Sequence, residues 1–169
     1  ELHYYIYEDC DVITRSAKVI NTEEDKIRLT KAQAACIDFL HGEFDVISFY
    51  GRHAMERNMQ RTSVGHGAFV IGSRRGTSSH QYNPMMILAE KETTEDAGTC
   101  YGMSFVYSGG FKAEVEKDQF GQTRMQMGLQ EEQFSYPLKK GEEFVIPEVI
   151  LTCSNQGLEK LSQNLQRCI

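Results

Sequence analysis

The histidines of this chain are the first residues to test for acid–base or metal chemistry. His53, His66 and His80 lie close together in the sequence, and Glu56 lies among them. Their spacing matches none of the HxH, HExxH or Cys/His patterns that bring zinc ligands together. The chain also lacks the GxSxG motif of serine hydrolases and the glycine-rich loops that hold phosphates. We therefore expect no catalytic residue, no metal site and no cofactor in this chain.

Two polar segments are long enough to form a binding surface. Residues 51–61, GRHAMERNMQR, interleave arginines with methionines, and residues 73–84, SRRGTSSHQYNP, contain two adjacent arginines and one histidine. Polar runs of this kind usually form ordered loops in which Ser, Thr and Asn side chains bond to the backbone. Planar guanidinium groups also suit hydrogen bonding to a polyhydroxyl ligand or to a protein partner. Both interpretations stay open at this point.

The cysteines indicate a reducing compartment. An odd number cannot pair completely within one molecule, and no two cysteines have the CxxC spacing of redox or metal motifs. Cys36, in AACIDFL, has the apolar neighbours typical of a small core residue. We predict that the chain has no structural disulfide and is cytoplasmic. The five cysteines are Cys10, Cys36, Cys100, Cys153 and Cys168.

Length and composition indicate one acidic globular domain. The chain has 169 residues, 40% of them hydrophobic, and a formal charge of −6. A domain of this size buries roughly 70% of its extended-chain surface when it folds. The acidic balance argues against nucleic-acid binding, and no apolar run reaches the length of a membrane span. The sequence opens in an alternating run with neither an initiator Met nor a signal peptide, so we expect it to be part of a longer protein.

Alternation of apolar and polar residues, which is typical of half-buried strands, runs through most of the chain. Turn residues separate the alternating segments roughly every ten positions, as in an antiparallel, all-β sandwich. Residues 30–40 also contain helix-forming alanines, but we expect a strand there. The predicted strands are residues 3–8, 12–21, 27–39, 44–50, 53–62, 68–73, 85–90, 101–107, 111–118, 123–128, 134–138 and 144–152.

One helix is predicted, at the C-terminal end. Leu158, Leu161 and Leu165 recur at helical spacing, and Ser154 and Asn155 before them are suited to cap a helix. A lone amphipathic helix needs a surface to cover. This helix therefore either packs on the same domain or leads onward to a further one.

Four segments, taken in order, resemble a known family. They are GRHAMERNMQR, SRRGTSSHQYNP, YGMSFVYSGGF and EVEKDQFGQTRMQMGL, and the closing stretch from Gly141 extends the similarity to essentially the whole chain. In order and spacing they resemble the N-terminal domain of bacterial α-galactosidases of glycoside hydrolase family 36. The resemblance implies a galactose-mutarotase-like antiparallel β-supersandwich over residues 1–153, truncated at its start. It also implies a helical linker over residues 154–169, toward a catalytic (β/α)8 barrel that this chain lacks.

The same resemblance implies a function. Family members cleave terminal α-galactosyl residues from melibiose- and raffinose-type galactosides with retention, using two Asp residues on the barrel. Neither Asp motif occurs here, so this chain alone is expected to be inactive, to shape the substrate pocket of a parent enzyme, and to support its homo-oligomer. In the family pattern G-R-W-x-x-E-R a Trp lies against the sugar. His53 takes that position here, which makes it the expected substrate-binding residue.

Two alternative interpretations belong to other functional classes. The first is a free-standing carbohydrate-binding module that uses the same sandwich face. The second is a mutarotase-like enzyme, in which Glu56 as a base and His66 or His80 as an acid would converge on one sheet.

Overall fold

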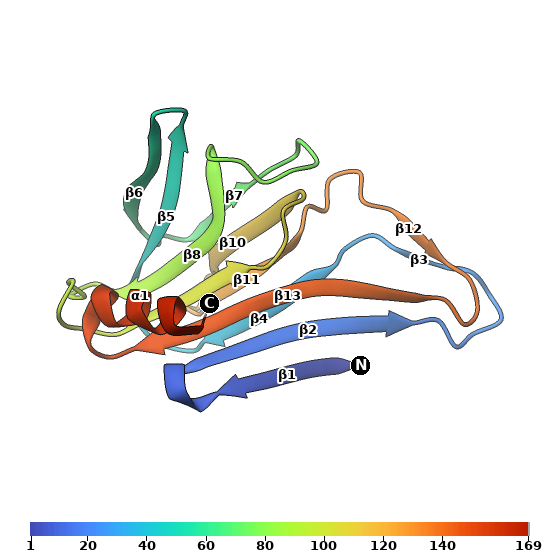
Figure 1. Ribbon diagram of the computed structural model, residues 1–169, viewed down its shortest axis with the longest axis horizontal. Helices are drawn as coiled ribbons and strands as arrows, with labels where there is room; N and C mark the ends of the chain where they lie inside the picture. Colours follow the sequence, from blue (N-terminus) through green and yellow to red (C-terminus); the bar gives the residue numbers. More distant parts are fainter. Residues whose placement is uncertain (169) are drawn as a thin grey trace.

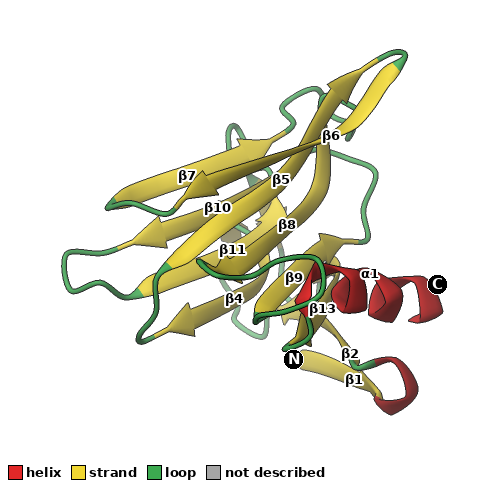
Figure 2. Ribbon diagram, turned by 90° about the vertical axis from the view of Figure 1, so that its left-hand side faces the viewer, coloured by secondary structure: helices red, strands yellow, loops and turns green. Residues whose placement is uncertain are grey.

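The computed structural model describes residues 1–168, which form two main antiparallel sheets packed face to face and one helix outside them (Figures 1 and 2). The seven-stranded sheet has the order β1 (Leu2–Tyr7), β2 (Val12–Ile20), β13 (Glu143–Ser154), β9 (Cys100–Phe105), β8 (Tyr82–Glu90), β5 (Phe44–Arg52) and β6 (Met55–Ser63). The four-stranded sheet has the order β4 (Gln33–Phe39), β11 (Thr123–Leu129), β10 (Phe111–Lys117) and β7 (Gly67–Gly72). A separate pair joins β12 (Tyr136–Leu138) to β3 (Ile27–Leu29), the short helix η1 (Glu8–Cys10) links β1 to β2, and α1 (Gly157–Cys168) follows β13.

The main hydrophobic core lies between the two sheets. In β10, Phe111, Ala113 and Val115 are fully buried and alternate with charged residues, as period-2 patterning requires. From the other sheet, Met86 and Leu88 of β8 belong to the same core cluster. Burying side chains of this size stabilises the fold by roughly 1.5–3 kcal/mol each. The predicted antiparallel sandwich is confirmed.

Helix α1 packs on the outer face of the seven-stranded sheet. Leu161 is 1% exposed and shares a second apolar cluster with Ile47, Ile87 and Cys100. Gly102 lies beneath the helix, and a Cβ at that position would stand 3.3 Å from a methyl group of Leu161. The predicted helix is confirmed, and of the two roles left open for it, packing on this domain is the one the structure shows.

Strand β13 lies in the middle of the larger sheet although it is the last strand of the chain. It pairs with β2 on one side and with β9 on the other, so that Val149 stands between Arg15 and Phe105. The ladder with β2 shifts between Ile146 and Val149. Pro147 lies in that shift, where its missing N–H costs no ladder hydrogen bond.

The predicted strands agree with the structure except at their ends, and two of them need correction. The predicted strand 27–39 is divided into β3 and β4, with residues 30–40 containing strand and no helix. The predicted strand 53–62 begins two residues late, at Met55, because residues 53 and 54 form a turn.

The prediction that Cys36 is a core residue is wrong, because the structure exposes it. The pairing of β4 with β11 has a bulge opposite Met127 and Gly128, and as a result the successive residues Ala34 and Ala35 are both buried. Alternation then resumes with Cys36 pointing outward. Cys10 and Cys100 are buried, and burial raises the pKa of the Cys100 thiol to about 11.

No helix in the described part of the chain combines the length and the apolar character needed to cross a membrane.

Candidate functional site

His53 lies at the tip of a projecting hairpin. Strands β5 and β6 pair as far as Arg52 and Met55, which leaves His53 and Ala54 as a two-residue loop. The hairpin, which we call the β5–β6 ribbon, extends beyond the rest of the sandwich (Figure 1). Along β6, seven of the nine residues are exposed, a pattern that a strand covering a core would not show. The ribbon therefore presents His53, which is itself exposed, away from the sandwich.

The backbone of the ribbon tip is tightly specified. A Cβ at Gly51 would stand 2.4 Å from the carbonyl oxygen of Met55, so the two strands approach more closely than any side chain at this position would allow. Ala54 and Arg57 both adopt left-handed backbone angles, with φ of 64° and 58°. Asn58 donates its amide to the carbonyl oxygen of Met55 at 2.8 Å. The strained backbone angles and the hydrogen bond to a backbone carbonyl hold the tip in one shape, although it is exposed to solvent.

Glu56 also acts on the tip. Its Oε1 accepts a hydrogen bond from the N–H of Ala54 at 3.0 Å, which supports the turn beside His53. Arg52 points its guanidinium at the sulfur of Met55, with 3.3 Å between Nη2 and Sδ. Each of these contacts joins residues of the tip to one another, and the imidazole ring of His53 takes no part in the hydrogen bonds found among residues 1–168.

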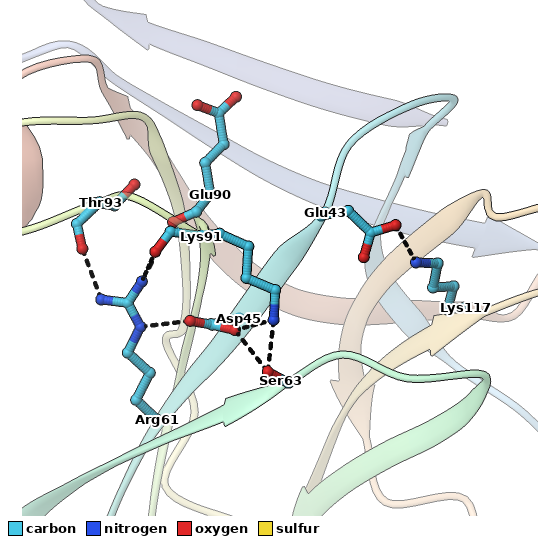
Figure 3. Close-up of polar contacts among 8 residues, drawn as sticks. All are labelled: Glu43, Asp45, Arg61, Ser63, Glu90, Lys91, Thr93 and Lys117. Carbon is cyan, nitrogen blue, oxygen red and sulfur yellow. Dashed lines mark hydrogen bonds and ion pairs between the residues drawn. The ribbon is translucent and has the colours of Figure 1, made fainter.

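At the opposite end of the ribbon, a network of charged side chains holds its base (Figure 3). The carboxylate of Asp45 accepts hydrogen bonds from Arg61 Nε at 2.8 Å, from Lys91 Nζ at 2.5 Å and from Ser63 Oγ at 3.2 Å. Arg61 also donates to the carbonyl oxygen of Thr93 at 2.7 Å. Burial raises the pKa of Asp45, but the bonds from Lys91 and Arg61 outweigh it and hold that pKa below its usual value. The base is therefore tied to the turn that follows β8.

The second polar segment forms the wall of a groove. Residues 73–81 connect β7 to β8, and two neighbouring cavities of about 700 and 490 Å³ lie beside them. The cavities share Ser73, Arg74, Gln130 and Glu132 in their linings, so they adjoin each other, and we call the two together the loop groove. The volume of each cavity falls in the range of small-molecule sites, roughly 300–1,000 Å³.

The charges in the loop groove are paired except for Arg75, which forms no ion pair within residues 1–168. Lys112 contacts Glu114 at 2.7 Å and Glu131 at 2.5 Å, while Arg74 pairs with Glu132. Burial lowers the pKa of Lys112, but its two carboxylate partners outweigh that effect and raise the net pKa. The hydrogen bond from Lys112 lowers the pKa of Glu131. The groove thus offers donors and acceptors with little net charge.

Glu56, His66 and His80, the other titratable candidates, form no hydrogen bond or ion pair with one another within residues 1–168. Glu56 stands at the start of β6 and His66 beyond its end, which at about 3.3 Å per residue separates them by roughly 20 Å. Nδ1 of His66 instead contacts the carbonyl oxygen of Asp118 at 2.7 Å. His80 lies in the loop before β8, beside Gln81, whose carbonyl oxygen accepts from the N–H of Gly51, but in the described part of the chain no hydrogen bond or ion pair joins His80 to Glu56. Within residues 1–168 no three His, Cys, Asp or Glu side chains are grouped as metal ligands.

The sequence analysis missed two features that only the topology creates. The loop groove draws its lining from residues near 70–82, 107–112 and 129–134 and from Phe144, which no local pattern connects. The base network joins Asp45, Arg61 and Lys91, which lie on three neighbouring strands or their ends. The only sequence signal for either was the polar character of segments 51–61 and 73–84.

Comparison with known proteins gives consistent results for sequence and fold. Residues 1–139 match the Glycosyl hydrolase family 36 N-terminal domain. The bifunctional alpha-galactosidase/sucrose kinase AgaSK of Mediterraneibacter gnavus is 62% identical over 100% of this chain and 18% of its own length. Alpha-galactosidase Mel36A of Lactobacillus acidophilus is 45% identical over 96% of this chain and 22% of its own length.

Solved structures extend the similarity to three dimensions. The galactosidase domain of AgaSK superposes with a TM-score of 0.94 at 63% identity, over 96% of this chain and 23% of that one. The alpha-galactosidase AgaA of Geobacillus stearothermophilus, in a complex with raffinose, gives a TM-score of 0.94 at 42% identity, also over 96% of this chain and 23% of its own. This chain thus spans about a fifth of the length of the curated relatives it matches. On this evidence the chain belongs to the N-terminal domain family of the family 36 glycosyl hydrolases.

Proposed function

We propose that this chain is the non-catalytic N-terminal part of a retaining α-galactosidase that removes terminal α-galactosyl residues from melibiose- and raffinose-type galactosides. The observation that carries the proposal is the 62% identity to the M. gnavus enzyme over the whole chain. The complexes of the G. stearothermophilus enzyme with raffinose and stachyose support the class of substrate.

In this proposal the catalytic carboxylates lie outside the chain, on a barrel that follows residues 154–169. Retention requires two carboxyl groups about 5 Å apart, one of which must donate a proton. Glu131 and Glu132, the adjacent acidic residues of the loop groove, are paired with Lys112 and Arg74. The lowered pKa of Glu131 makes it a poor proton donor at neutral pH. Residues 1–153 would therefore bind and position substrate rather than cleave it.

His53 is the residue we propose to contact the sugar. The ribbon tip fixes the backbone beside His53 and uses neither ring nitrogen in a hydrogen bond, which leaves both available to a sugar hydroxyl. An imidazole also keeps part of the stacking face of the Trp that the family pattern has there, with a smaller area. Because it is smaller, His53 should give weaker apolar contact than Trp.

The parent enzyme is further proposed to be a cytoplasmic homo-oligomer. The five cysteines, all free in the structure, support a reducing location. Thiol titration of freshly purified, denatured and unreduced protein should then find close to five free groups, and a reproducible count of three or fewer would contradict the location.

A chimera tests the proposed function directly. The segment of the M. gnavus enzyme that aligns with this chain is replaced by residues 1–169, and hydrolysis of melibiose and raffinose is measured at steady state. The chimera should retain activity, and the isolated chain should show none. In the chimera, His53→Ala should lower kcat/KM several-fold with an unchanged melting curve, whereas His53→Trp should be tolerated.

Each outcome of the chimera experiment has a defined meaning. A folded but inactive chimera would overturn the proposed function, and binding of galactosides by the isolated chain would then favour a free-standing carbohydrate-binding module. Turnover by the isolated chain would show that catalytic groups lie within it. Unchanged kinetics for His53→Ala on both substrates would remove His53 from the site.

A further inference from the structure

We propose that the loop groove binds a neutral oligosaccharide. The groove runs beside the β7–β8 loop and the end of β10, and its two cavities meet at Ser73, Arg74, Gln130 and Glu132. This inference rests on the lining of the groove and stands independently of the proposed function.

Most of the charges that line the groove are already paired. Lys112 is held between Glu114 and Glu131, and Arg74 is paired with Glu132, so these cations and anions neutralise one another. Arg75 also lines the larger cavity and forms no ion pair within residues 1–168, so phosphate is the competing anionic probe, whereas a metal cation would meet ammonium and guanidinium groups. A neutral ligand with hydroxyl groups can instead accept from the N–H donors and donate to the carboxylates at once.

Unused hydrogen-bonding groups line the same groove. The side chains of Gln81 and Tyr82 form no hydrogen bond within residues 1–168, although both line the larger cavity. The ring of Tyr82 packs against the main core, which fixes the direction of its hydroxyl group. Gln130 is held at both ends, because its Nε2 donates to the carbonyl oxygen of Phe111 and its Oε1 accepts from the N–H of Glu132. Tyr82 and Gln130 are therefore positioned before any ligand arrives, while Gln81 offers an exposed amide.

The smaller cavity adds aromatic faces. The ring of Tyr107 packs against Gly109, where a Cβ would stand 2.3 Å from the ring, and 42% of the Tyr107 surface is exposed. Phe134 and Phe144, with ring centroids 5.8 Å apart, line the same cavity. Flat, partly exposed rings beside fixed polar groups suit the apolar faces and hydroxyl edges of pyranose rings.

Titration of the isolated chain with stachyose, followed by backbone amide NMR, tests the inference. Saturable shifts are expected at residues of the groove, such as Gly72, Gln81 and Gln130, with a dissociation constant on the order of 1–10 mM for so open a site. Inorganic phosphate, used as the anionic probe, should cause none. Gln81→Ala, which removes one exposed polar side chain, should weaken binding about fivefold, and Tyr107→Ala should weaken it at least as much.

Arg124→Ala provides the matched control. Arg124 forms an exposed pair with Asp38 at the opposite end of β11 from Gln130, and its loss should leave the stachyose affinity unchanged. Saturation by phosphate but not by stachyose would make the groove an anion site and overturn the inference. Absence of saturable shifts, or equal weakening by all three substitutions, would also overturn it. Should Tyr107→Ala fail to fold, Gln81→Ala alone decides.

Discussion

The two ends of the β5–β6 ribbon are fixed by different forces. At the base, the half-buried carboxylate of Asp45 gathers Arg61, Lys91 and Ser63, and side-chain electrostatics tie three strands together. At the tip, Gly51 and the left-handed backbone of Ala54 set the shape while the side chains stay in solvent. The base of the ribbon thus contributes stability. The tip leaves the side chain of His53 free to contact other molecules, because the geometry of the turn does not depend on that side chain.

Asp45→Ala should have the largest effect on stability. It leaves Arg61 and Lys91 without their carboxylate in a half-buried place, at an expected cost of about 2–3 kcal/mol in the free energy of unfolding. Urea denaturation measures the loss. The matched control is Asp38→Ala, which breaks an exposed pair with Arg124 and should cost clearly less. Equal losses for the two variants would mean that the base network adds no more than a surface pair does.

Gly51→Ala should have the next largest effect, and it acts on the tip. The added Cβ meets the carbonyl oxygen of Met55, so the strands must separate, at a cost of about 1–2 kcal/mol. Gly65→Ala is the control, because a Cβ there would have no atom within 4 Å, and its effect should stay within about 0.5 kcal/mol. If both variants melt like the parent chain, the close approach at the tip is not a constraint on stability.

Acid should weaken the charged network at the base of the ribbon. The pKa of Asp45 is lowered in the fold, so its contribution is present above the unfolded value, near 3.9, and is lost as the pH falls through the folded value. Stability measured between pH 6 and the acid transition should therefore fall less steeply in Asp45→Asn than in the unchanged chain. Identical slopes would assign the acid dependence to other carboxylates.

His53→Ala should have the smallest effect on stability, within about 0.5 kcal/mol, because the ring is exposed and the turn does not depend on it. Thermal unfolding of the isolated chain provides the measurement. A loss as large as that of Gly51→Ala would give His53 a structural part in the tip and remove the contrast between the two ends.

The sequence predicted the strands well because alternation is a local property. In β10, three buried residues alternate with charged ones, and the pattern identified that strand without knowledge of its partners. Cys36 shows the limit of this approach. Its exposure follows from a bulge opposite Met127 and Gly128, and a bulge is a property of the pairing between two strands that are about ninety residues apart.

The candidate site was less predictable for the same reason. The prediction placed His53 within a strand because the turn lacks the Asn-Gly or Asp-Gly pair that normally marks a two-residue loop, and Ala54 adopts the positive φ instead. The loop groove depends on the meeting of four distant segments, which composition cannot show. The resemblance to family 36 supplied the family and the expected role of His53, neither of which periodicity could reveal.

The central place of β13 has a consequence for how the protein is made. The seven-stranded sheet stays in two pieces, β1–β2 and β9–β8–β5–β6, until residues 143–154 have left the ribosome and joined them. Until then, the nascent chain exposes two open strand edges. Closing the sheet with β13, whose contacts with β2 join residues more than a hundred positions apart, should make folding of this region slow, on the scale of milliseconds to seconds. Release of the chain before β13 is made would leave an aggregation-prone product.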